Sequence, residues 1–136
     1  MNKPTLDHIG IAVRSIGDAK IYEALGLTID HVERVETQGV TTAFLSAGQV
    51  NLELLEPLSP ESTVAKFIEK RGEGIHHICL RVDDIDSHLE RLKAGGFRLI
   101  DQQPVPGAHG CRVAFLHPAA GHGVLIELSE KVEERP

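Results

Sequence analysis

The stretch LDHIGIAV at residues 6–13 decides the fold, because it returns as IHHICLRV at residues 75–82. A later pair repeats in the same way: NLEL at 51–54 matches LIEL at 125–128. The offset between copies grows from 69 residues (75 against 6) to 74 (125 against 51), as expected if the second copy has longer loops. Internal repetition of this kind predicts two equivalent structural modules in one chain.

Each copy has the pattern of a strand, a helix and three further strands. Alternating and β-branched stretches predict the strands, and Gly26 and Gly95 are typical stop signals for the two helices. In the first copy the expected strands are 8–13, 28–36, 40–46 and 50–55, with a helix at 15–25. In the second copy they are 77–82, 98–102, 111–116 and 124–128, with a helix at 85–94.

We therefore predict an α+β fold with two tandem βαβββ modules. The whole chain, residues 1–136, is expected to be one domain, with modules at about 5–57 and 74–130 and a connector helix at about 60–71. One helix cannot cover both faces of a four-stranded sheet. The two sheets are therefore expected to form an open, curved, eight-stranded surface around a cleft.

Composition excludes some classes of partner. The formal net charge is −6, and no basic cluster is longer than Lys70-Arg71, so a nucleic-acid partner is not expected. No apolar run has transmembrane length, and the N-terminus lacks the apolar core of a signal peptide. Cys79 and Cys111 are too few for a disulfide framework, which favours reduced thiols and a cytoplasmic protein.

The repeat places one histidine and one glutamate at matching positions of each module, His8 with Glu53 and His77 with Glu127. Two imidazoles and two carboxylates suit Mn²⁺, Fe²⁺, Co²⁺, Ni²⁺ or Zn²⁺, and two octahedral positions stay open for substrate. Taken singly, each residue is better explained as a strand-edge or surface side chain. As a repeat-related set they indicate that the cleft binds a metal.

Two details support this ligand set. His77 is preferred to its neighbour His76 because His77 falls on His8 in the repeat, whereas His76 falls on Asp7. Glu127 lies in the apolar run GVLIEL at 123–128, where an unpaired buried charge would be costly. A bound metal would remove that cost.

With ELLEPL at 53–58, GIHHI at 74–78 and GVLIEL at 123–128, the chain resembles the vicinal oxygen chelate superfamily, which includes glyoxalases, bleomycin resistance proteins and dioxygenases. Within it, the chain looks like the methylmalonyl-CoA epimerases from residue 6 to residue 128. The resemblance implies interconversion of (2R)- and (2S)-methylmalonyl-CoA by proton abstraction at C2 through an enolate. It also implies one divalent metal per chain, an acyl-CoA substrate and a homodimer.

The resemblance further implies roles for individual residues. The four metal ligands of the family match His8, Glu53, His77 and Glu127, and the metal-bound carboxylate that matches Glu127 also serves as a catalytic acid/base group. Some members place a second carboxylate where this chain has Thr42, which cannot act as a base. The candidates for the second group are Glu36, Glu53, His109 or a metal-bound water.

Other residues have a functional and a plain structural interpretation. A glycine-rich loop permits close backbone approach to a substrate, although a flexible hairpin connection explains it equally well. The loop residues proposed to bind substrate are Gly107, Ala108, His109 and Gly110. Lys66, Lys70 and Arg71 could meet the phosphates of coenzyme A, or simply form a solvated helix face.

Three other functions remain possible on the same fold. Lactoylglutathione lyase also moves a proton next to a carbonyl at a His/Glu metal site. An extradiol-type dioxygenase needs only two histidines and one carboxylate, so Glu53 argues against it. A non-enzymatic protein that binds or sequesters a small molecule would need no metal, and the complete ligand set argues against that reading.

Overall fold

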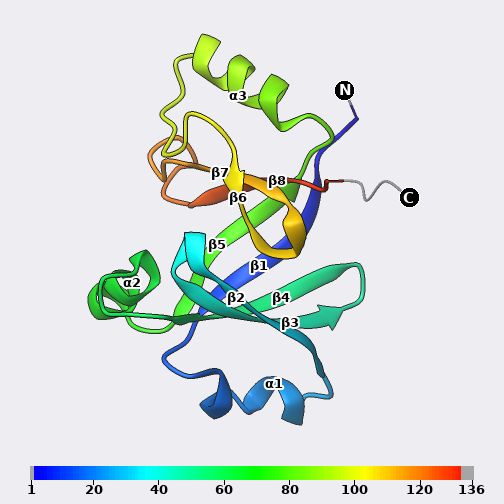
Figure 1. Ribbon diagram of the computed structural model, residues 1–136, viewed down its shortest axis with the longest axis vertical. Coiled ribbons are helices and arrows are strands. Elements are labelled where there is room, and N and C mark those ends of the chain that lie inside the picture. The colour runs from blue at the N-terminus through cyan, green and yellow to red at the C-terminus, as the bar shows by residue number, and fades with distance from the viewer. Residues whose placement is uncertain (1, 133–136) are drawn as a thin grey trace. The chain divides into compact units, whose positions relative to one another are not determined.

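The computed structural model describes residues 2–132. The chain divides into two compact units, which we call modules. The first module is His8–His76, and the second contains the residues up to Asp7 and those from His77 onward. The boundaries therefore fall inside two strands, β1 (Thr5–Ala12) and β5 (Gly74–Arg81), which are labelled in Figure 1.

The first module is built on a sheet with strand order β2-β3-β4-β1. β2 (Ile29–Val35), β3 (Val40–Ala47) and β4 (Val50–Pro57) are antiparallel neighbours, and β4 pairs in parallel with β1. A short helix, α1 (Ile21–Ala24), lies on one side of this sheet (Figure 1). Its apolar contacts form a core with the sheet, made of Val13, Ala43, Leu45 and Leu54 with Ile16, Ala19 and Tyr22 packed against them.

Two helical segments complete the first module. The 3₁₀ helix η2 (Glu36–Gln38) turns the chain from β2 into β3, and its end residue Gly39 has a left-handed φ of 67°. α2 (Thr63–Arg71) follows β4, and the Ser62 hydroxyl accepts a hydrogen bond from the Ala65 N–H at 3.1 Å. This bond satisfies one of the free N–H groups at the start of the helix.

The second module repeats the plan with strand order β5-β8-β7-β6. β5 pairs in parallel with β8 (Ile126–Glu130), which is antiparallel to β7 (Arg112–Leu116), and β7 pairs with the short β6 (Val105–Pro106). α3 (Ile85–Ala94) packs on β7 and β8. The core between helix and sheet consists of Val82, Ile85, Leu89, Ala114, Leu116 and Leu128.

The predicted α+β class and the two βαβββ modules with eight strands are confirmed. The helix predicted over residues 15–25 is wrong in its continuity. It consists of η1 (Ile16–Asp18) and the four-residue α1, separated at Ala19, whose ψ of 56° is not helical. The segment contains Gly17, and glycine is a poor residue for a helix interior.

The strand predicted over residues 98–102 is also wrong. Only Leu99 makes a bridge, to Leu116, and the edge strand of this sheet is instead β6, in what was predicted to be a loop. The cause is Asp101, whose Oδ2 accepts the Phe115 N–H at 2.8 Å. A side chain thus occupies the place where a neighbouring strand would present a backbone carbonyl.

The segment before His8 is held by contacts within the second module. Asn2 Nδ2 donates to Asp83 Oδ2 at 2.6 Å, and Asp7 Oδ1 lies 3.1 Å from an Arg81 guanidinium nitrogen. The beginning of the chain is therefore tied to residues that follow it by more than 70 positions.

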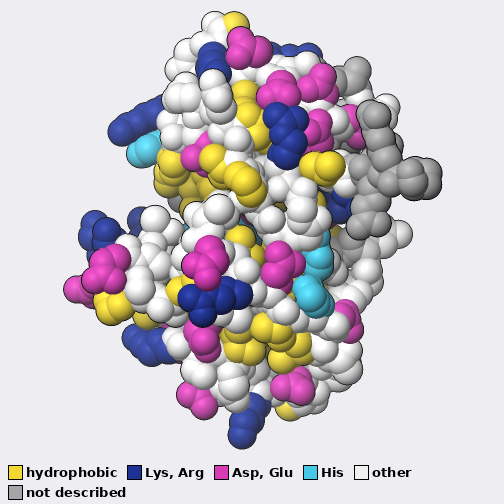
Figure 2. Space-filling model, viewed as in Figure 1, with side chains coloured by type: hydrophobic (Ala, Val, Ile, Leu, Met, Phe, Trp, Pro, Cys, Tyr) yellow, Lys and Arg dark blue, Asp and Glu magenta, His cyan; other side chains and the backbone are white. Residues whose placement is uncertain are grey.

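Acidic and basic side chains are interspersed over the face of the molecule in Figure 2, with no extended basic area on that face. This agrees with the net charge of −6. Within residues 2–132, no helix has both the length and the apolar character needed to cross a membrane.

Candidate metal centre

In the first module, β1 and β4 bring His8 and Glu53 together. Gly10 and Glu53 are direct partners in the parallel register, so they share a sheet face, and His8 lies on that face because it is two residues from Gly10. Gly10 has no side chain to separate the two groups. His8 Nδ1 lies 2.8 Å from Glu53 Oε2, and both side chains are buried.

In the second module, β5 and β8 bring His77 and Glu127 together. Cys79 is the register partner of Glu127, and His77 shares its face two residues earlier. His77 Nε2 lies 3.0 Å from Glu127 Oε1, and both side chains are buried. The ring of Phe115, which pairs with Glu127 in register, contacts the His77 ring edge to face, with centroids 5.5 Å apart.

The structure thus contains two equivalent imidazole–carboxylate pairs, one in each module. A buried carboxylate is stabilised by such a partner, so each pair is chemically sensible in itself. The pairs offer nitrogen and oxygen donors and no thiolate, which fits a borderline divalent metal such as Co²⁺, Mn²⁺, Ni²⁺, Fe²⁺ or Zn²⁺. The donor chemistry therefore fits the predicted cofactor.

His76 lies on the opposite face of β5, as expected. Its ring contacts Phe67 of α2, with centroids 5.0 Å apart and the rings nearly perpendicular. His76 thus packs between strand and helix in the first module.

The candidates for a second acid/base group are placed very differently. Glu36 lies in η2 with 71% of its side chain exposed, and its carboxylate is 2.8 Å from Arg34 Nε. Glu53 is already paired with His8. Thr42 is buried on the same face as Glu53, because Thr42 and Phe44 alternate along β3 and Phe44 pairs with Glu53.

The predicted substrate loop is compact. Cys111 N–H donates to the Ala108 carbonyl, Gly107 N–H donates to the Cys111 carbonyl, and His109 between them has a left-handed φ of 55°. A Cβ on Gly107 would lie 2.7 Å from a Val113 methyl group, so a side chain here would force Val113 of β7 to shift. The role of the loop in substrate binding stays a prediction.

The basic residues of α2 are exposed. The Arg71 guanidinium lies over the Phe67 ring, 5.9 Å from its centroid. Lys66 and Lys70 are free to meet solvent or an anion, so their predicted contact with coenzyme A phosphates also stays a prediction.

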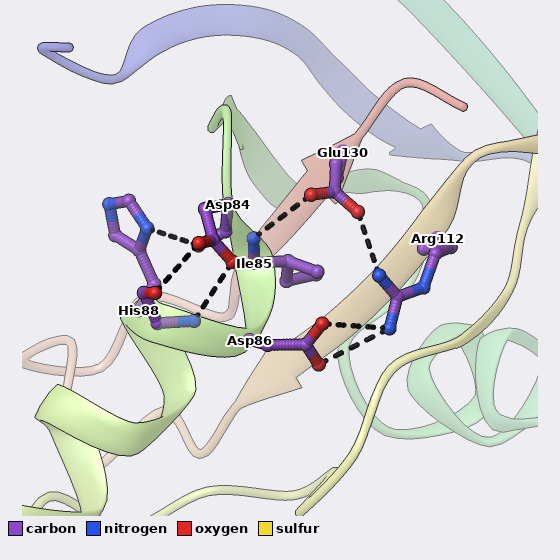
Figure 3. Close-up of polar contacts among 7 residues, drawn as sticks. Asp84, Ile85, Asp86, His88, Arg112 and Glu130 are labelled. Carbon is purple, nitrogen blue, oxygen red and sulfur yellow. Dashed lines mark hydrogen bonds and ion pairs between the residues drawn. The ribbon is translucent and has the colours of Figure 1, made fainter. Parts of the chain in front are cut away.

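Sequence reasoning missed a polar network at the start of α3 (Figure 3). Asp84 accepts hydrogen bonds from the Ser87 N–H and hydroxyl, at 3.2 Å and 2.8 Å. Arg112 joins Asp86 and Glu130, and Glu130 in turn accepts the Ile85 N–H. The Asp-x-x-Ser spacing at 84–87, which is typical of a helix N-cap, could have revealed the first part.

Sequence reasoning also passed over His31 and Glu33 on β2. Their alternation indicates a shared face, and His31 Nε2 lies 3.4 Å from Glu33 Oε1. The His31 ring stacks on Phe44, the register partner of Glu53.

A family model for the Glyoxalase/Bleomycin resistance protein/Dioxygenase superfamily matches residues 7–115. The chain belongs to this superfamily. It is 39% identical over 129 residues to the ethylmalonyl-CoA/methylmalonyl-CoA epimerase of Cereibacter sphaeroides, covering 92% of this chain and 96% of the relative. An uncharacterized Bacillus subtilis protein, YqjC, is 49% identical over 127 residues, covering 92% and 91%.

A solved structure of an epimerase is also similar to this chain, in both fold and sequence. A variant of Streptomyces coelicolor methylmalonyl-CoA epimerase, in complex with 2-nitronate-propionyl-CoA, has a TM-score of 0.87 and 38% identity, covering 94% of this chain and 97% of that one. The expected membership of the vicinal oxygen chelate superfamily and the likeness to its epimerases are therefore confirmed.

Proposed function

We propose that this protein interconverts (2R)- and (2S)-methylmalonyl-CoA by metal-assisted removal of the proton at C2. The observation that carries the proposal is the pair of buried His–Glu contacts, at 2.8 Å and 3.0 Å, at repeat-related positions. Similarity to epimerases along nearly the whole chain supports the choice of substrate. The resemblance also supports a homodimer, and the small number of cysteines favours a cytoplasmic protein.

The proposed cofactor is one divalent metal per chain, held by His8, Glu53, His77 and Glu127. When bound, the metal would supply positive charge that stabilises the enolate oxygen of the thioester. The candidate metals are Co²⁺, Mn²⁺, Zn²⁺, Ni²⁺ and Fe²⁺, all of which accept imidazole and carboxylate donors.

Glu127 is proposed as one acid/base group. Its carboxylate accepts the C2 proton, and the C–H electrons move into the C1–C2 bond to give the enolate. His77 contacts the same carboxylate at 3.0 Å, and the Phe115 ring lies against His77, so the imidazole has little freedom to turn. Burial of both groups keeps bulk water from the carboxylate.

The test is deuterium incorporation at C2 of methylmalonyl-CoA in D₂O, followed by NMR with a readout of stereochemistry. We expect Co²⁺-loaded protein to exchange C2 and interconvert the epimers, and Glu127→Gln to slow interconversion by ~10²-fold or more. Glu130→Gln is a matched control on the same strand, since Glu130 contacts Arg112 rather than His77.

Absence of exchange by fully metallated protein would contradict the proposal. The glutathione hemithioacetal should then be tried, because lactoylglutathione lyase chemistry uses a similar donor set. Binding of a small molecule without turnover of either substrate would favour the non-enzymatic alternative.

A further inference from the structure

The inference concerns the second proton-transfer group and rests on the proposed function. Epimerisation removes a proton from one face of C2 and returns one to the other, so it needs two groups on different sides of the carbon. Glu127 belongs to the second module. Since the proposed ligand set takes His8 and Glu53 from one face of the first-module sheet, the other group is sought on that face.

The strand registers show which side chains share that face. Phe44 pairs with Glu53 across β3 and β4, and Thr42 is two residues from Phe44. On the other side of β3, Glu33 of β2 is the direct partner of Thr42. Direct partners in antiparallel strands project to the same face, so Glu33 shares the face of Glu53.

A ring contact confirms this assignment independently. His31 is the register partner of Phe44, and the two rings stack with centroids 5.6 Å apart and an interplanar angle of 25°. Glu33 is two residues from His31, and its carboxylate lies 3.4 Å from His31 Nε2. Both side chains must therefore lie on the Phe44 side of the sheet.

Glu33 is accessible but partly enclosed, unlike Glu36 and Glu53, the two carboxylates considered above. Its side chain is 30% exposed, whereas that of Glu36 is 71% exposed and contacts Arg34. Glu53 is buried against His8. β2 and β4 are separated only by β3, which places them about 10 Å apart, with Thr42 and Phe44 between Glu33 and Glu53.

We propose that Glu33 is the second catalytic acid/base group. In one direction the ionised Glu33 carboxylate takes the proton from C2, the C–H pair becomes the enolate, and protonated Glu127 gives its proton to the opposite face of C2. In the other direction the two glutamates exchange roles. Each turnover moves one proton from one glutamate to the other, and exchange with solvent or reverse turnover restores the starting state.

Glu33 thus stands beside Thr42, the position at which some superfamily members carry a carboxylate. A carboxylate on β2 in place of one on β3 would reach the same sheet face from the adjacent strand.

The test is Glu33→Gln in Co²⁺-loaded protein, with each epimer supplied separately in D₂O. We expect interconversion to fall by ~10²–10⁴-fold, while one epimer still exchanges C2 with retention through Glu127. Co²⁺ affinity and the Co²⁺ absorption spectrum should match those of the unsubstituted protein. Arg34→Gln, on the opposite face of the same strand, should leave interconversion unchanged.

Three results would overturn the proposal. The first is that Glu33→Gln exchanges both epimers at the original rates. The second is that Glu33→Gln loses exchange of both epimers and binds Co²⁺ more weakly. The third is that Glu36→Gln, and not Glu33→Gln, exchanges only one epimer. If the unsubstituted protein exchanges neither epimer, the proposed function itself has failed, and that result is distinct from all three.

Discussion

A glycine outside the His–Glu pairs controls how β8 begins. Gly121 lies in a tight coil in which Gly121 N–H donates to the Pro118 carbonyl and Val124 N–H donates to the Gly121 carbonyl. A Cβ at Gly121 would lie 2.3 Å from the Val124 carbonyl oxygen and 3.0 Å from the Ile126 side chain. The coil therefore requires a residue without a side chain, and β8 with Glu127 follows directly from it.

Gly121→Ala is expected to destabilise the protein by roughly 1–3 kcal/mol, because the methyl group meets backbone that cannot move aside easily. Urea unfolding measures this change. Gly17→Ala is the control, since its Cβ would meet only Ser15 Oγ at 3.7 Å. Equal stability of the two variants would show that the coil can relax.

At the N-terminus of α3, two carboxylates, those of Asp84 and Glu130, accept backbone N–H groups. The Ser87 hydroxyl, with help from the Ser87 N–H, holds the pKa of Asp84 below its usual value of 3.8. The hydrogen bonds from Arg112 to Asp86, and then to Glu130, raise the pKa of Arg112, which stays charged throughout. The ion pairs link helix to sheet, because Asp86 is on α3, whereas Arg112 is on β7 and Glu130 is on β8.

This arrangement predicts a pH dependence of stability. The folded-state pKa of Asp84 is lowered, so its contribution is fully present above the unfolded value of 3.8 and is lost as pH falls through the folded value. The difference in unfolding free energy between the protein and Asp84→Asn should therefore shrink between neutral pH and about pH 3. A constant difference over that range would argue against an ionised cap.

The elements most faithfully predicted from sequence are those with strong local signals. The helix expected at 85–94 is observed as Ile85–Ala94, where Asp84 and Gly95 mark its ends. The failure at 98–102 has a tertiary cause, since the Asp101 carboxylate replaces a strand partner of Phe115. Likewise, the repeat predicted both His–Glu pairs, whereas Glu33 becomes prominent only through its register with Thr42.

At the scale of the whole molecule, each module supplies one His–Glu pair to the proposed ligand set. Each module has its own hydrophobic core, and the residues of these cores include none of the four proposed ligands. The module boundaries near 5–57 and 74–130 and the homodimer stay predictions.

If the four ligands hold one ion, Co²⁺ should bind once per chain and raise the melting temperature. At Co²⁺ about 100 times above Kd, the expected gain is about 2.7 kcal/mol. His8→Ala and His77→Ala, one from each module, should each remove this gain. It is measured by calorimetry on chelator-treated protein with and without added Co²⁺. Retention of the full gain in either variant would mean that one pair binds the metal alone.

The contacts of Asn2 with Asp83 and of Asp7 with Arg81 have a consequence for biosynthesis. A ribosome releases the chain from its beginning, and the complete His8–His76 unit emerges before either of these partners. Asn2 and Asp7 can therefore form these contacts only after Arg81 and Asp83 have been synthesised. During translation, contacts within His8–His76 can form before those between the N-terminal segment and the residues from His77 onward.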